Sequence, residues 1–115
     1  MRLLFPVHLL MNENRIPFIM GSSDGPILYI FNMEENALAF AADTGLLEFG
    51  VCKVPDASTL YEILTNALAG FTGEFWFNER LSGTHAIQFL GHIPAGAFFE
   101  VLKSHADAEG KAGQN

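Results

Sequence analysis

The apolar residues in the middle of the chain repeat at helical spacing in two places. The clearer repeat lies between Asp56 and Gly70, where positions i, i+3, i+4, i+7 and i+8 are Leu60, Ile63, Leu64, Ala67 and Leu68. This spacing places them on one stripe of an amphipathic helix. Asp56 has the carboxylate of a good N-cap, and a glycine such as Gly70 is typical of a helix end. The pattern therefore predicts a helix that begins after Asp56 and ends near Gly70.

A second repeat predicts a helix over residues 33–44. Its apolar positions are Ala37, Phe40 and Ala41. Asn32 and Glu35 form an Asn-x-x-Glu capping box, in which each side chain accepts a hydrogen bond from the other residue's backbone N–H. The pair Glu34 and Glu35 also suits a helix start, because the helix dipole stabilises negative charge there. Gly45 is predicted to end this helix as a left-handed C-cap.

Short apolar runs around these helices predict strands. Ile27–Phe31 is continuous and apolar, as in a strand that is buried on both faces. Residues 46–54 alternate imperfectly, and residues 74–78 are dense in aromatic side chains, which favour a pleated surface. The centre of the chain is therefore strand, helix, strand, helix, strand. The two helices share one face of the sheet if the strand order keeps extending, and lie on opposite faces if it reverses.

The residues before this centre predict two more strands, over 3–11 and 16–20, joined by a polar turn. Pro6 and Pro17 lack a backbone donor, so we expect these strands at an edge of the sheet or beside a bulge. Residues 21–26 are turn formers and predict a second reversal. A glycine-rich loop can also bind phosphate, but this one has no lysine and leads into a strand, which favours a hairpin turn.

The residues after the centre predict one strand and one helix. Residues 85–90 alternate, and Pro94 stands where a helix of about ten residues would begin. The apolar stripe of that helix consists of Ala97, Phe98, Val101 and Leu102. From Ala106 on, the composition turns polar, which predicts a frayed end. The whole pattern predicts one α/β or α+β domain over residues 1–105, with a flexible tail at 106–115. The domain would hold a single mixed sheet of about six strands, a central βαβαβ unit and three short helices.

The charge of the chain limits the classes of partner. The 115 residues carry a net charge of −7 and have no basic patch. Nucleic acids and anionic membranes are therefore disfavoured, because binding either of them requires positive charge. No apolar run is long enough for a transmembrane helix, and the apolar start of the chain lacks the cleavage site of a signal peptide. The single cysteine, Cys52, cannot form an internal disulfide, which suits the cytoplasm.

The apolar content points instead to a protein partner. Half the residues are apolar and only 17% are charged, a low charged share for a soluble domain. A second copy of the chain is the simplest partner, so we expect a homodimer. The candidate interaction residues are Trp76, Phe75 and Phe77. Because side chains alternate along a strand, Trp76 would face outward when Phe75 and Phe77 face the core, and Trp is enriched at interface hot spots.

Several features between Arg15 and Asn78 follow one another in a recognisable order. They are the run Ile16-Pro17-Phe18-Ile19, the turn with Asp24-Gly25, the strand end Tyr29-Ile30-Phe31 and the sequence Glu34-Glu35-x-Ala37-x-x-Phe40. Together they resemble the amino-terminal domain of SseB-type proteins, in which strand, helix, strand, helix and a strand ending near Asn succeed one another. Phe77-Asn78 would take that last place. The resemblance covers about half the chain. It implies an α/β fold and carries no catalytic signature, so it assigns no functional residue.

The alternative hypothesis, from a different class, is a small enzyme or a metal- or ligand-binding domain at one end of the sheet. The histidines His8, His85, His92 and His105 would need a carboxylate such as Asp24 or Glu79 to complete a metal site, and no pair has the i, i+4 spacing of a metal motif. Cys52 with His85 would supply a nucleophile and a base, but no signature surrounds either. We therefore expect no metal, cofactor or catalytic residue. The leading hypothesis is a noncatalytic module that acts through protein–protein contacts.

Overall fold

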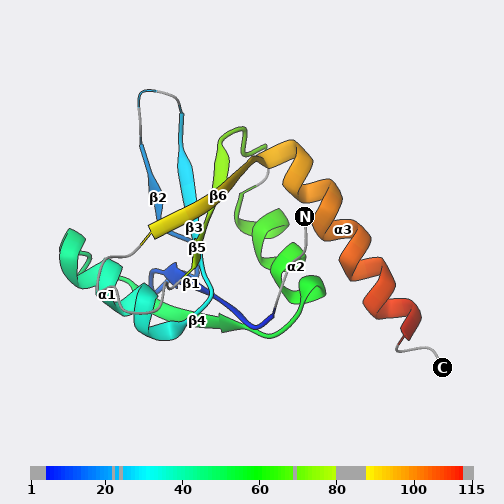
Figure 1. Ribbon diagram of the computed structural model, residues 1–115, viewed down its shortest axis with the longest axis horizontal. Coiled ribbons are helices and arrows are strands. Elements are labelled where there is room, and N and C mark those ends of the chain that lie inside the picture. Colours follow the sequence, from blue (N-terminus) through cyan, green and yellow to red (C-terminus); the bar gives the residue numbers. More distant parts are fainter. Residues whose placement is uncertain (1–4, 22, 24, 69, 80–87, 113–115) are drawn as a thin grey trace.

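The computed structural model describes residues 5–21, 23, 25–68, 70–79 and 88–112 (Figure 1). In this part of the chain, six strands form one mixed sheet in the order β4-β1-β3-β5-β6, with β2 paired to β3. The elements are β1 (Val7–Met11), β2 (Ile19–Met20), β3 (Ile27–Phe31), α1 (Glu34–Thr44), β4 (Gly50–Val54), α2 (Ala57–Ala67), β5 (Glu74–Glu79), β6 (Gln88–Pro94) and α3 (Ala95–Ala112). The predicted fold class, one mixed sheet with three helices, is confirmed.

The central βαβαβ unit is present, but another strand is inserted into it. β3 and β5 are parallel neighbours, whereas β1 lies between β3 and β4 and is antiparallel to both. The chain thus moves from β3 to one edge of the sheet at β4, and then back across the sheet to β5. Because the strand order reverses, α1 lies on one face of the sheet while α2 and α3 lie on the other (Figure 1). This settles which of the two arrangements the chain adopts.

Two hydrophobic cores follow from this arrangement. The larger core lies between the sheet and the helices α2 and α3, and its largest fully buried side chains include Phe75, Phe98 and Leu64. The smaller core lies under α1, where Phe31 and Ala37 are fully buried and Phe40 packs against them. Successive side chains of a strand point to opposite faces, so β1, β3 and β4 contribute to both cores, whereas β2, β5 and β6 contribute to the larger core alone.

The predicted helix ends are partly confirmed. The Asp56 side chain accepts a hydrogen bond of 2.8 Å from the backbone N–H of Thr59 and caps α2, as expected. Gly45 has a φ of 73° and ends α1 in the left-handed conformation. The capping box at Asn32 is wrong, because α1 begins later and its N-cap is Met33, which makes no side-chain cap hydrogen bond. Asn32 Oδ1 accepts instead from the amide Nδ2 of Asn36, at 3.2 Å.

The end of α2 differs slightly from the prediction at Gly70. The helix ends at Ala67, and Leu68 is its C-cap. Gly70 has a φ of 80° and therefore lies in the turn beyond the helix, where a left-handed residue is needed.

The strands before β3 pair differently from the expectation. The hairpin predicted over residues 21–26 is present, since β2 is antiparallel to β3. The expected edge position is wrong for the first strand, because β1 is an interior strand. Pro6 precedes β1 and so costs it no ladder donor. Pro17 lies outside the ladder, in an isolated bridge with Met11, and β2 pairs with β3 rather than with β1.

The last helix of the described residues extends further than the composition indicates. The predicted strand over 85–90 begins at Gln88 in the described residues and continues to Pro94, while 85–87 lie outside those residues. α3 follows Pro94, as expected, but it has 18 residues instead of about ten. The frayed end expected from Ala106 is helical as far as Ala112, because Ala106 packs against the larger core and Glu109 binds the start of α2.

Candidate interaction surface

The three aromatic residues singled out in β5 lie on opposite faces of the sheet. Phe75 is fully buried in the larger core, and Phe77 packs against Phe98 with ring centroids 5.3 Å apart. Trp76 is half-buried on the other face. This is the alternation that the sequence predicts for a strand. Phe75 and Phe77 therefore stabilise the core, and an interaction role at this place rests on Trp76.

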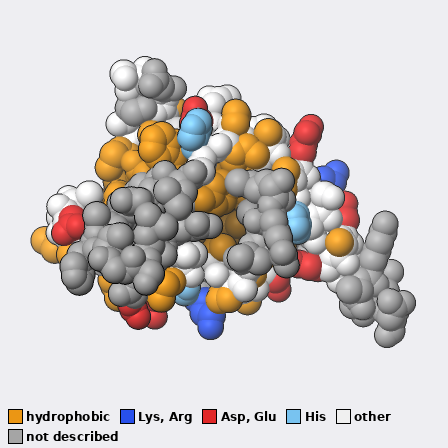
Figure 2. Space-filling model, viewed as in Figure 1, with side chains coloured by type: hydrophobic (Ala, Val, Ile, Leu, Met, Phe, Trp, Pro, Cys, Tyr) orange, Lys and Arg blue, Asp and Glu red, His pale blue; other side chains and the backbone are white. Residues whose placement is uncertain are grey.

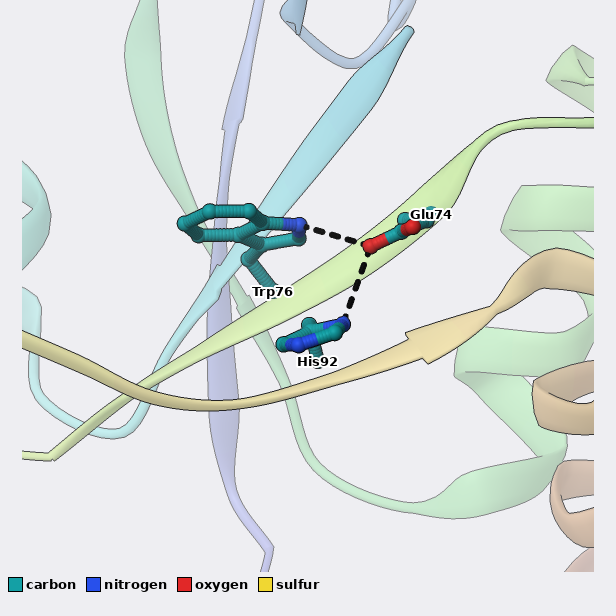
Figure 3. A network of polar contacts seen from close by, with 3 residues as sticks. All are labelled: Glu74, Trp76 and His92. Atoms are coloured by element: carbon teal, nitrogen blue, oxygen red, sulfur yellow. Dashed lines mark hydrogen bonds and ion pairs between the residues drawn. The ribbon is translucent and has the colours of Figure 1, made fainter. Parts of the chain in front are cut away.

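A single carboxylate holds Trp76 and a histidine in place (Figure 3). The indole N–H of Trp76 donates to Glu74 Oε2 at 3.1 Å, and His92 Nδ1 lies 3.0 Å from the same oxygen. Glu74 and Trp76 share a face because they are two residues apart in β5, and the β5–β6 register sets His92 opposite Trp76. The two rings lie 5.5 Å apart. The Glu74 carboxylate therefore orients both the indole ring of Trp76 and the imidazole ring of His92.

An aromatic chain connects this cluster to α1. Tyr29 contacts Trp76 edge-on, with ring centroids 6.3 Å apart, and contacts Phe40 of α1 at 4.8 Å. The Tyr29 hydroxyl donates to the sulfur of Met20 at 3.3 Å. Burial raises the pKa of Tyr29, so its hydroxyl stays protonated at neutral pH. Figure 2 shows hydrophobic side chains gathered over β2 and β3, with a histidine beside them.

The helix on this face covers only part of the sheet. α1 packs on β1, β3 and β4. In the described part of the chain, β5 and β6 carry no helix on this face, and the side chain of His92 is 63% exposed there. A sheet face that meets water usually carries polar side chains, whereas Trp76 lies here, with Tyr29 and Met20 beside it on β3 and β2. The part of this face formed by Glu74, Trp76 and His92, over which no described helix lies, is called the β5–β6 surface and is therefore suited to contact with a protein.

The outer side of α1 carries exposed apolar residues between acidic ones. Leu38 is 53% exposed and Leu47, just after the helix, is 95% exposed, and Ala39 and Ala42 are exposed beside them. A helix that is apolar on both sides is normally buried on both sides. Four acidic residues border this outer side, namely Glu34, Glu35, Asp43 and Glu48. We call the four exposed apolar residues the α1 surface.

Of the residues of the enzyme hypothesis, Cys52 and His92 have described places, and these two are not brought together. Cys52 lies in β4 at one edge of the sheet and packs against the larger core, whereas His92 lies in β6 at the opposite edge and on the other face. Four strand spacings of about 4.8 Å separate these edges by about 19 Å. His85 and Asp24 lie outside the described residues. Over the residues that the structure describes, no three His, Cys, Asp or Glu side chains form a group that could hold a metal ion.

Some functional candidates were missed by the sequence reasoning. Glu74 and Trp76 are two apart in a predicted strand, so their shared face could have been inferred. The approach of His92 to Glu74 could not have been inferred from the sequence. It depends on the register between β5 and β6 and on the bulge at Phe77 and Asn78. Leu38 and Leu47 carried a readable signal, since they add apolar residues to the helix and its end outside the predicted stripe.

Comparison with known proteins assigns no family to the chain. No family model matches the chain, and no curated protein matches it. The resemblance to SseB-type domains therefore stays a prediction. None of the helices over the described residues is long and apolar enough to cross a membrane.

Proposed function

We propose that this protein is a noncatalytic interaction module that forms a homodimer, with α1 of each copy lying on the β5–β6 surface of the other. The observation that carries the proposal is that α1 covers only part of one sheet face while its own outer side carries exposed apolar residues. Over the described residues, one chain thus offers both exposed apolar side chains on the outer side of α1 and a sheet area on which no described helix lies. In a dimer, α1 of the second copy covers the β5–β6 surface, and the β5–β6 surface of the second copy covers α1.

The two surfaces fit each other in size and symmetry. α1 has 11 residues, which corresponds to a length of about 16 Å. This length suffices to cross the neighbouring strands β5 and β6, whose axes lie about 4.8 Å apart. A two-fold axis makes the contact twice, because each copy gives its helix and receives its partner's. The buried apolar area therefore doubles without any further surface on the chain.

The charges favour this pairing over a direct contact between the two α1 helices. Two α1 helices face to face would bring Glu34, Asp43 and Glu48 near their own copies. On the β5–β6 surface the one carboxylate of the cluster, Glu74, is already bound to His92. The acidic border of α1 would therefore meet an area in which this carboxylate is already bound and an exposed histidine lies beside it.

The free cysteine is consistent with a role inside the cell. Cys52 forms no disulfide in the described structure. Thiols stay reduced in the cytoplasm, which is where we propose that the dimer acts.

Light scattering coupled to size exclusion tests the dimer. We expect the mass of two chains for the wild type, and the mass of one chain for Leu38→Glu, because a carboxylate would be buried in the contact. Leu38 is exposed in the single chain, so the variant should keep its fold, which circular dichroism checks. Ala108→Glu adds the same charge at an exposed position of α3 and should remain dimeric. A monomeric wild type, or a dimeric Leu38→Glu, would overturn the proposal.

Substitutions at His92 test the sheet side of the contact. His92→Glu should weaken the dimer by at least about tenfold, because it opposes the acidic border of α1. His92→Lys places a cationic partner beside Glu74 and should leave the dimer intact. Equal dissociation constants for the two variants in analytical ultracentrifugation would show that α1 does not lie on this surface.

A further inference from the structure

A groove on a different part of the molecule runs along the free edge of the sheet. β4 is an outermost strand, paired with β1 on one side and with no described strand on the other. α2 follows the groove on one flank, and the turn between β1 and β2 closes one end. The cavity has a volume of about 970 Å³. Its lining shares no residue with the α1 surface or with the Glu74–Trp76–His92 cluster.

We propose that this groove binds an extended acidic segment of another protein, which adds to β4 as a further strand. The outer edge of β4 presents backbone N–H and C=O groups that an extended chain can pair with. A groove between a strand edge and a helix also supplies places for alternate side chains, which is how strand addition gives specificity. β4 has five residues, so it would pair with a segment of about five residues.

The charge of the groove selects an acidic partner. Although the chain has a net charge of −7, the lining contains two cationic residues, Arg15 and Lys53, and one carboxylate, Glu62. The cationic residues whose side chains the structure describes are Arg15, Lys53 and Lys103, so two of these three lie at the groove. A carboxylate would be repelled by most of this molecule and attracted here.

The other residues that line the groove favour a bound segment with apolar side chains between its acidic ones. Ile63 and Cys52 are partly buried against the larger core, and Ile16 is 47% exposed at the closed end of the groove. Because side chains alternate along a strand, one side of the bound segment would face these apolar residues. The ligand class is therefore an extended peptide in which acidic and apolar residues alternate.

Titration with synthetic peptides tests the site on the full chain. The probe is a capped peptide of about six residues in which glutamate and valine alternate. Amide resonances of β4 should shift as it binds, and a matched peptide of lysine and valine should not bind. The variants Arg15→Glu and Lys53→Glu should each weaken binding at least about tenfold, since each replaces an attraction with a repulsion. Lys103→Glu, away from the groove, should bind as the wild type does.

Methylation of the peptide backbone tests the strand geometry. The N–H groups of alternate residues point to the same edge of a strand. Methylating the amide nitrogens of one alternate set should abolish binding, and methylating the other set should leave it unchanged. Equal binding of the two methylated peptides, or of the lysine and glutamate peptides, would overturn the proposal.

The same experiment separates this site from the dimer. Leu38→Glu should bind the peptide with unchanged affinity, because the groove does not include the α1 surface. If the β4 resonances shift with protein concentration in the absence of peptide, the occupant is a second copy of the chain, and the peptide proposal is wrong. A loss of the dimer with retained peptide binding would overturn only the proposed function.

Discussion

His8 is a buried histidine with one ring nitrogen that makes no hydrogen bond. It is 8% exposed in β1, and its Nδ1 has no partner. Desolvation lowers the pKa of His8 below 6.5, with a smaller lowering by Lys53 of β4 and an opposing effect of Glu34 of α1. The folded chain therefore holds His8 neutral under conditions in which the unfolded chain binds a proton.

This histidine should make the fold sensitive to acid. Since the unfolded state binds the proton more readily, the free energy of unfolding should fall as the pH drops from about 7 to about 5. His8→Leu should remove part of this slope and stabilise the fold by about 1 kcal/mol, because an unsatisfied polar atom disappears. Urea unfolding at several pH values and a fixed protein concentration measures both effects. If the stability of His8→Leu depends on pH as steeply as that of the wild type, His8 does not cause the sensitivity to acid.

Two backbone segments approach each other so closely at position 73 that the position requires glycine. Its carbonyl accepts from the N–H of Ala95 at 2.9 Å, and the next residue, Glu74, donates its N–H to the Pro26 carbonyl at 3.0 Å. A Cβ at Gly73 would overlap the Pro26 carbonyl oxygen and lie 2.8 Å from the ring of Phe71. The junction between β3, β5 and α3 therefore has no space for a side chain.

Substitution of this glycine should be costly. Gly73→Ala should lower the free energy of unfolding by about 2 kcal/mol or more, because backbone atoms must shift. Gly96→Ala is the matched control, since a Cβ there meets nothing within 4 Å and lies in a helix. We expect the control to be neutral or stabilising by about 0.5 kcal/mol. Equal stabilities of the two variants in urea unfolding would contradict this account.

At the scale of elements, two carboxylates hold the start of α2. Asp56 accepts from the N–H of Thr59. Glu109, near the end of α3, accepts from the N–H groups of Ala57 and Ser58 at 2.8 Å and 3.0 Å. The first three N–H groups of α2, which have no partner within a helix, are thus all bonded. This arrangement joins α2 to α3 and keeps the last turns of α3 helical.

Loss of the Glu109 carboxylate should loosen both helices. Glu109→Ala should lower the free energy of unfolding by about 1 kcal/mol, as removal of a capping group does. Hydrogen exchange should also become faster over residues 106–112. Glu100→Ala, which removes an exposed carboxylate of the same helix, is the control and should change neither quantity. Unchanged exchange in Glu109→Ala would show that packing alone holds the end of α3.

Asp56 adds an acid-dependent contribution at the same helix end. Hydrogen bonds from Thr59 lower the pKa of Asp56 below its usual value of 3.8. The stabilisation is therefore present above that value and is lost as the pH falls through the lowered pKa. In a pH titration of stability, this loss should occur at lower pH than the change caused by His8, and Asp56→Ala should remove it.

At the scale of the whole molecule, the net charge of −7 acts in opposite ways on the two proposed contacts. Two copies of the chain repel each other, so screening should tighten the dimer between about 0.05 M and 0.5 M NaCl. The acidic peptide is attracted by Arg15 and Lys53, so the same change should weaken its binding. Analytical ultracentrifugation and peptide titration over one salt series measure both constants. Salt dependences of the same sign would contradict the assignment of charge to the two surfaces.

The sequence by itself determined the parts of the fold that depend on neighbours along the chain. The stripe of α2, the Asp56 and Gly45 caps and the turn between β2 and β3 involve contacts over a few residues, and all are present. The alternation in β5 likewise follows from strand geometry, so the opposite faces of Trp76 and Phe75 could be predicted. These features need no knowledge of which strands are paired.

Only the tertiary structure decided the features that join distant parts of the chain. It inserted β1 between β3 and β4, which left β4 as a free edge, and it brought His92 to Glu74 and Glu109 to α2. The expected cap at Asn32 was wrong, and residues 106–112 are helical, for the same reason, since packing overrode local preference. Strand order and register are set by the burial of whole faces, which no local pattern contains.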